Sequence, residues 1–195
     1  YAFSNLNVKL MDAKSAGEVV ALLKERLEAQ PESKWLYGRG WNDQNFEDEK
    51  RYPTKEEMDS VSTEIPVIVV RACGHASVVN SLALEKIMAL PDAAPLMGEY
   101  IHPETGVLNE QATKLFYKIM EERTVEEVEA MLHFGLTKLA ECGITCCQSD
   151  DLKAIPAAPW RTVIQAYKNL EAKGEMPVRI YEQCLCGTVA EYEEF

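Results

Sequence analysis

Residues 66–81 read Pro-Val-Ile-Val-Val-Arg-Ala-Cys-Gly-His-Ala-Ser-Val-Val-Asn-Ser, and the fold class can be inferred from their first half. Residues 66–72 form a mainly apolar run of strand length that is rich in β-branched side chains. Such a run is typical of a strand that is buried on both faces, as in the parallel sheets of α/β proteins. It therefore predicts an α/β fold.

Helices and strands alternate in the downstream part of the chain. Thr124 and Glu127 match a capping box that opens a helix over 124–142, and Gly143 stands where helices commonly end. The elements expected after it are a strand at 144–148, a helix at 157–173 and a strand at 178–184. Strand–helix–strand units with short connections predict right-handed crossovers and a parallel sheet.

The upstream part of the chain is less regular. Its expected elements are helices at 13–28, 78–90 and 108–120, a strand at 35–41, and a short helix opened by a Thr54–Glu57 capping box. Gly38 and Gly40 in the expected strand let another backbone or a ligand approach closely. Residues 42–106 are richer in loops than the rest, so we expect an irregular insertion there.

The composition argues against two classes of partner. Asp and Glu number 32 against 20 Lys and Arg, which gives a formal net charge of −12 at pH 7. Because an acidic protein gains nothing from neutralising phosphates, we expect neither nucleic acid nor a membrane surface as a partner. No apolar run approaches the roughly 20 residues that span a bilayer, and no signal-peptide pattern is seen. The first residue, Tyr1, is interpreted as the result of trimming or processing.

The chain has 6 cysteines, at positions 73, 142, 146, 147, 184 and 186. They lie in apolar stretches of a chain that is long enough to bury a core. We therefore expect reduced, buried thiols in a cytoplasmic protein rather than disulfides. The paired CxxC spacing of a structural zinc site is absent, and Cys146-Cys147 and Cys184-Leu-Cys186 fit alternate faces of strands.

Histidines and carboxylates give few candidates for chemistry. The 3 histidines are far apart, so neither an HxH pair nor an HExxH helix exists. His75 directly follows the strand at 66–72, where α/β folds often place ligand sites, and a structural and a functional role are equally compatible with that position. Asp150 and Asp151 are expected to cap a helix, and Glu110 is expected at a helix start.

Several stretches together resemble amidohydrolase family 3, the branch of the amidohydrolase superfamily that includes N-substituted formamide deformylases. No single motif is specific, but their order and spacing over residues 35–150 are. The stretches are Trp35-Leu-Tyr-Gly-Arg-Gly-Trp-Asn42, Arg51-Tyr-Pro-Thr-Lys55, Met58-Asp-Ser-Val-Ser62, residues 66–81, Thr105-Gly-Val-Leu-Asn-Glu110 and Gly143-Ile-Thr145.

The resemblance implies that residues 1–195 are an incomplete segment of a metal-dependent (β/α)8 TIM barrel, with an insertion at 42–106. In such proteins an HxH pair, later histidines and an aspartate bind zinc or another divalent metal, which activates a water for attack on an amide-type carbonyl. The resemblance implies that this chain contributes to the metal site only the carboxylate of Glu110. The resemblance also implies that Arg71, His75 and Trp41 line the pocket of a small amide-type substrate.

The leading hypothesis is a fragment of a hydrolase that acts on non-peptide carbon–nitrogen bonds. A catalytic zinc usually has three protein ligands and a water, so the segment alone is expected to bind no metal and to be inactive, with no catalytic residue of its own. Because the barrel is incomplete, we expect either self-association or covering of the bare strand edges and apolar faces by the chain's own insertion. The alternatives are a non-catalytic, barrel-derived domain that binds a ligand or partner, and an unrelated α/β domain with a chance likeness.

Overall fold

The computed structural model describes residues 7–184 and 189–194. They belong to two compact units, which divide at Met120 and Glu121. The units are called here the N-terminal unit and the C-terminal unit, and each is described by itself. Both combine helices and strands, so the α/β class is confirmed.

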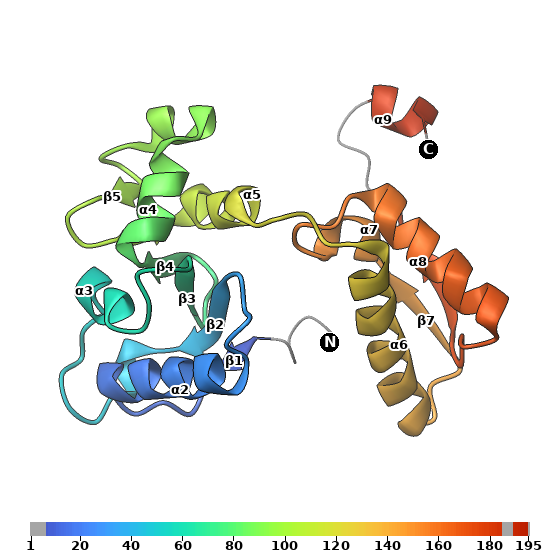
Figure 1. Cartoon of the computed structure of the whole chain (residues 1–195), viewed down its shortest axis with the longest axis horizontal. Helices are drawn as coiled ribbons and strands as arrows, with labels where there is room; N and C mark the ends of the chain where they lie inside the picture. Colours follow the sequence, from blue (N-terminus) through green and yellow to red (C-terminus); the bar gives the residue numbers. More distant parts are fainter. Residues whose placement is uncertain (1–6, 185–188, 195) are drawn as a thin grey trace. The chain divides into compact units, whose positions relative to one another are not determined.

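The N-terminal unit is built on a six-stranded sheet with the order β1-β2-β3-β4-β6-β5. Strands β1 to β5 are labelled in Figure 1. Its strands are β1 (Val8–Lys9), β2 (Leu36–Trp41), β3 (Val67–Arg71), β4 (Ala76–Val79), β5 (Ile101–His102) and β6 (Val107–Asn109). The predicted strand at 66–72 is β3, in the middle of the sheet, with four fully buried or nearly buried residues. It pairs in parallel with β2 but antiparallel with β4, so the sheet is mixed and the prediction of a parallel sheet holds for β1, β2 and β3.

Two predicted helices of this unit begin too early. The expected helix at 78–90 is α4 (Ser81–Met88), because Val78 and Val79 pair with β3 as part of β4. The expected helix at 108–120 consists of β6, a 3-10 helix η3 (Glu110–Leu115) and the short α5 (Phe116–Ile119). In both places β-branched or apolar residues pair with a neighbouring strand, and this pairing overrides the helical spacing.

Helices cover the sheet. The helical elements not yet given are α2 (Ala16–Ala29), α3 (Lys55–Asp59), and the 3-10 helices η1 (Asp43–Asn45) and η2 (Pro91–Leu96). Val19 and Leu23 of α2 pack with Val67 and Val69 of β3 in one core cluster. On β2, Tyr37 contacts Phe116 of α5, with the ring centroids 6.3 Å apart. The predicted capping box of α3 is confirmed, since Thr54 and Glu57 exchange both hydrogen bonds.

The glycines of β2 allow a close backbone approach, as predicted, and the neighbour is the chain itself. The backbone N–H of Leu10 donates to the carbonyl of Arg39 at 2.9 Å. A Cβ on Gly38 would lie 2.6 Å from Leu10 Cδ1, and one on Gly40 would lie 2.5 Å from Met11 Cγ. Gly40 also has a φ of +112°, which few other residues adopt. The close approach of Leu10 and Met11 therefore explains why positions 38 and 40 are glycine.

Asn80 is a buried connector that the sequence interpretation did not single out. Its Oδ1 accepts from the backbone N–H groups of Val67 and Ala83, and its Nδ2 donates to the carbonyls of Ser62 and Ile65. All four bonds that an amide side chain can make are thus satisfied in a residue with 0% exposure. Asn80 caps α4 and ties it to β3.

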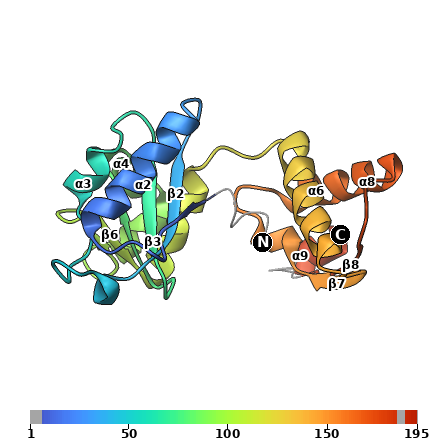
Figure 2. The same ribbon diagram turned by 90° about the horizontal axis from the view of Figure 1, so that it is seen from below.

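The C-terminal unit follows the predicted alternation. Its elements are α6 (Val125–Glu141), β7 (Cys146–Ser149), α7 (Asp151–Ala154), α8 (Trp160–Lys173), β8 (Arg179–Glu182) and α9 (Val189–Glu194). β7 and β8 pair in parallel, as predicted. The Thr124–Glu127 capping box is confirmed, while Asp150 makes no side-chain cap bond at α7. Residues of α6 and α8 form one core cluster with Cys147 and Ile180. The two helices lie on one face of the two strands (Figure 2).

Cys73, Cys142, Cys146 and Cys147 are free thiols, but the prediction that the cysteines are buried is wrong for the described ones. Cys73, Cys142, Cys146 and Cys184 are exposed and Cys147 is half-buried. In β7 the reason is that α6 and α8 cover only one face of a two-stranded sheet, so every second side chain is exposed. Cys186 lies outside the described residues.

The proposed insertion at 42–106 stays a prediction. That range includes β3 and β4, which pair with β2 and β6 outside it. Within the described residues, no helix is long and apolar enough to cross a membrane.

Candidate functional site at one edge of the N-terminal sheet

Polar side chains gather where three strands of the N-terminal unit end. β4 is antiparallel to both β3 and β6, so β6 runs in the same direction as β3 and β2. The carboxyl ends of β2, β3 and β6 consequently meet at one edge of the sheet. Asn42 and Asp43 follow β2, Arg71 ends β3, and Glu110 follows β6. This edge is where α/β folds commonly place ligand sites.

Arg71 is held in place by the residues after β2. Its Nε donates to Asp43 Oδ1 at 2.8 Å, and its Nη2 donates to Asn42 Oδ1 at 3.0 Å. The side chains of Arg71 and Asp43 are only 21% and 9% exposed. Burial alone would raise the pKa of Asp43, but the hydrogen bonds from Arg71 and Gln44 lower it. The guanidinium is therefore fixed at the edge in a defined orientation.

Cys73 lies in the turn between β3 and β4, within reach of the same guanidinium. Arg71 Nη1 lies 3.5 Å from its sulfur. The pKa of the Cys73 thiol is lowered by the backbone N–H of His75 and then by Arg71. The sequence interpretation missed Cys73, Asn42 and Asp43 at this edge. Their positions directly after β2 and β3 were the available signal.

His75 and Glu110 form a direct pair at this edge. His75 Nδ1 lies 2.9 Å from Glu110 Oε2, and the side chains are 69% and 57% exposed. The hydrogen bond and the charge of Glu110 raise the pKa of His75. Nε2 of His75 and Oε1 of Glu110 take no part in this contact. Because both side chains are more than half exposed, a ligand can reach them.

The backbone of Glu110 adopts an uncommon conformation. Its φ is +47°, in the left-handed region that non-glycine residues seldom occupy. Its N–H donates to the carbonyl of His75 at 2.8 Å, and its own carbonyl accepts from Thr113 Oγ1 at 2.7 Å. These bonds fix the conformation that turns the Glu110 side chain toward His75. Such outliers cluster at functional sites, which singles out Glu110 among the many carboxylates of the chain.

Trp41 lies in the core. It is 0% exposed, and its ring meets Tyr52 edge-on with the centroids 4.9 Å apart. Its indole N–H has no hydrogen-bond partner among the described residues. Trp41 pairs with Arg71 across β2 and β3, so it lies next to the edge. A role for it in a pocket wall stays a prediction.

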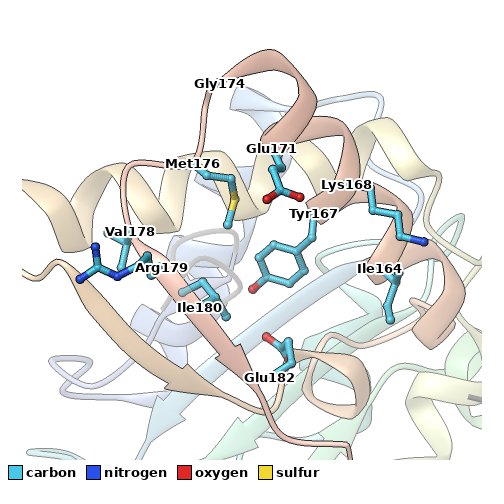
Figure 3. Close-up of a pocket in the computed structure, with 10 residues that line it drawn as sticks. All are labelled: Ile164, Tyr167, Lys168, Glu171, Gly174, Met176, Val178, Arg179, Ile180 and Glu182. Atoms are coloured by element: carbon cyan, nitrogen blue, oxygen red, sulfur yellow. The ribbon is translucent and has the colours of Figure 1, made fainter.

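The C-terminal unit contains a separate cavity between α8 and β8, of about 700 Å³ (Figure 3). Ile164, Met176, Val178 and Ile180 give it an apolar lining, and Tyr167 projects into it. At one end, Tyr167 donates a hydrogen bond of 2.6 Å to Asp151. Both carboxylate oxygens of Glu182 are closed to solvent there, and burial and then the charge of Asp151 raise its pKa to about 6.

Comparison with known proteins decides the family. The model of the amidohydrolase family matches residues 1–194, almost the whole chain. The chain belongs to the amidohydrolase family. A chance likeness of an unrelated α/β domain is thereby excluded.

Relatives in this amidohydrolase family are considerably longer. YtcJ of Bacillus subtilis strain 168, named as an amidohydrolase, is 28% identical over 186 residues, which are 90% of this chain and 34% of YtcJ. N-substituted formamide deformylase of Arthrobacter pascens is 24% identical over 174 residues, which are 85% of this chain and 31% of that protein. The chain thus spans about a third of the length of these relatives.

Solved structures share the fold. An uncharacterized metal-dependent hydrolase from Pyrococcus horikoshii OT3 matches with a TM-score of 0.66 and 21% identity, over 93% of this chain and 33% of that one. A second, from Pyrococcus furiosus, matches with a TM-score of 0.64 and 21% identity, over 93% of this chain and 34% of that one. The α/β arrangement seen here therefore recurs in larger proteins.

The described residues of this amidohydrolase chain do not make a complete metal site. In residues 7–184 and 189–194, no group of three or more His, Cys, Asp and Glu side chains could hold a metal ion. His75 and Glu110 supply two ligands at most, and Nδ1 of His75 already contacts Glu110. A catalytic zinc usually needs three protein ligands.

Proposed function

We propose that this chain is part of a metal-dependent hydrolase that cleaves carbon–nitrogen bonds in small, non-peptide, amide-type substrates. Membership of the amidohydrolase family supports this proposal, as does the relative named N-substituted formamide deformylase. The solved neighbours named as metal-dependent hydrolases support a divalent metal, zinc or another. A cytoplasmic location belongs to the same proposal and is supported by the free thiols.

We also propose that residues 1–195 are an incomplete segment of a (β/α)8 barrel, and the support for this comes from the C-terminal unit. In support, β7 and β8 are parallel and α6 and α8 pack on one face, as in such barrels. The outer edges of β7 and β8 have no strand partner among the described residues, so further strands could pair there. In the isolated chain, the same edges and the bare face would favour self-association.

The observation that carries the proposal furthest is the contact between His75 and Glu110. It brings two residues named from sequence to the carboxyl edge of the sheet, and the Glu110 backbone is held in an uncommon conformation there. We assign to Glu110 the role of a carboxylate offered to the metal, and to His75 and Arg71 the role of substrate contacts. The remaining metal ligands would come from outside the described residues, so the isolated chain would be inactive.

The proposal is tested with the complete polypeptide that contains this sequence and with the 195-residue chain alone. Each is loaded with zinc and assayed for amine release from N-butylformamide, N-phenylformamide and a panel of other amides. We expect turnover by the complete polypeptide and none by the chain alone. Glu110→Gln in the complete polypeptide should lower kcat/KM by about 100-fold, whereas Glu104→Gln, an exposed carboxylate nearby in sequence, should change it less than twofold.

The alternative function is a non-catalytic domain that binds a ligand or partner. It would be favoured if the complete polypeptide bound the amides but turned over none of them at any metal loading. If Glu110→Gln left turnover unchanged, the hydrolase function would stand, but Glu110 would not be part of the metal site.

A further inference from the structure

The β7–β8 sheet of the C-terminal unit has one covered face and one open face. Cys147 and Ile180 pack with α6 and α8 on the covered face. On the open face, Cys146, Gln148 and Arg179 are exposed, and Tyr181 is 65% exposed. The two faces therefore differ in exposure and in composition. The open face has an amide, a guanidinium and a phenol, whereas the covered face has Cys147 and Ile180 packed against α6 and α8, followed by Ser149 and Glu182.

The polar side chains of the open face indicate what kind of group this face contacts in the complete barrel. In a barrel with its helices outside, this face would point to the interior, and packed barrel interiors use mainly Val, Ile and Leu. A buried amide or phenol without a hydrogen-bond partner is unfavourable by about 1–3 kcal/mol. Gln148 and Tyr181 are thus poorly suited to a packed layer and well suited to a polar ligand or water.

The strand register places these two side chains side by side. Gln148 is paired with Tyr181, and Cys146 with Arg179, across the parallel strands. Neighbouring strands lie about 4.8 Å apart, so the amide and the phenol can contact one small molecule together. Gln148 and Tyr181 lie toward the carboxyl ends of β7 and β8, the end at which barrel enzymes place their sites. Beyond them, the N–H of Gln183 donates to the carbonyl of Ser149 at 2.8 Å, which continues the pairing.

We propose that Gln148 and Tyr181 form a substrate-binding pair that hydrogen-bonds the amide group of the substrate. This inference rests on the proposed function, because it takes the open face to be the inside of the complete barrel. The Gln148 side chain can donate to the substrate carbonyl and accept from its N–H, and the Tyr181 hydroxyl can do either. No covalent step is assigned to either residue.

The test uses the complete polypeptide with N-butylformamide and N-phenylformamide as probes. Gln148→Ala and Tyr181→Phe are each expected to raise KM about tenfold, the effect of one lost hydrogen bond, with kcat changed less than threefold. The matched controls are Gln165→Ala and Tyr192→Phe, which change the same residue types at exposed positions of α8 and α9. They should leave KM within twofold of wild type, and the melting temperature of all four variants is measured.

Three other outcomes would overturn the inference. If the wild type turns over the amides and Gln148→Ala and Tyr181→Phe leave KM unchanged, the pair does not bind substrate and the proposed function stands. If these variants lower the melting temperature without raising KM, the face is covered by packed side chains. If the wild type turns over no amide, the proposed function fails and the substrate pair fails with it.

Discussion

His75 Nδ1 lies 2.9 Å from Glu110 Oε2, although 35 residues separate the two along the chain. Because Glu110 raises the pKa of His75 above its ordinary value of 6.5, the imidazolium should persist to higher pH in the folded chain. NMR titration of the His75 ring protons should show this, and Glu110→Gln should lower the His75 pKa. The His133 signals provide the internal reference. An unchanged titration curve in Glu110→Gln would show that the pair does not form in solution.

Any stability that the pair contributes has a defined pH window. The folded pKa of His75 is raised, so the contribution is fully present below the unfolded pKa of 6.5 and is lost as pH rises through the folded value. Since both side chains are more than half exposed, the contribution is small.

Glu182 should make stability depend on pH in the C-terminal unit. Its folded pKa of about 6 lies above the ordinary 4.5, so its contribution to the unfolding free energy is fully present below pH 4.5 and is lost as pH rises through about 6. Glu182→Gln should raise the unfolding free energy by about 1 kcal/mol at pH 8 and leave it unchanged at pH 4. Urea unfolding at the two pH values measures this, with the exposed Glu171→Gln as control. Equal effects at both pH values would contradict the raised pKa of Glu182.

Asn80 should be important for the stability of the N-terminal unit. Asn80→Ala removes four hydrogen bonds inside a buried site and should lower the unfolding free energy by about 2–4 kcal/mol. Urea unfolding is followed by tryptophan fluorescence in a Trp160→Phe background. The signal then reports the unfolding of the N-terminal unit, because the other two tryptophans belong to it. Asn45→Ala, at an exposed position, should change stability by less than about 0.5 kcal/mol.

Gly106 and Gly98 provide a matched pair of positive-φ glycines. Their φ angles are similar, at +72° for Gly106 and +80° for Gly98. A Cβ on Gly106 would lie 2.6 Å from the carbonyl oxygen of Val79, whereas one on Gly98 would meet nothing within 4 Å. Gly98→Ala should therefore cost about 1 kcal/mol of unfolding free energy from backbone strain alone, and Gly106→Ala at least about 2 kcal/mol more. If the two variants lost similar amounts of unfolding free energy, the β4 backbone would be able to move away from the added Cβ at little cost.

Local signals in the sequence predicted local structure well. The Thr54–Glu57 and Thr124–Glu127 capping boxes formed as expected because both partners lie within one helical turn. The β-strand at 66–72 and the alternation after residue 124 were predictable for a similar reason, since each depends on a run of apolar residues.

Features that depend on tertiary pairing were not predictable in the same way. Val78 and Leu108 belong to short strands because each pairs with a partner strand, and helical spacing gave no hint of that. The contact between His75 and Glu110 depends on the register of β4 against β6, where Ala76 pairs with Asn109. The exposure of Cys146 follows from the number of strands in the C-terminal sheet, which the sequence of that segment does not determine.

Titration of zinc chloride into the isolated 195-residue chain tests most directly the claim that this segment offers Glu110 but lacks a complete metal site. Calorimetry with parallel measurement of the melting temperature should give binding no tighter than about 10 μM and a negligible thermal shift. A stoichiometric site of nanomolar affinity, with a melting temperature raised by several degrees, would contradict the claim.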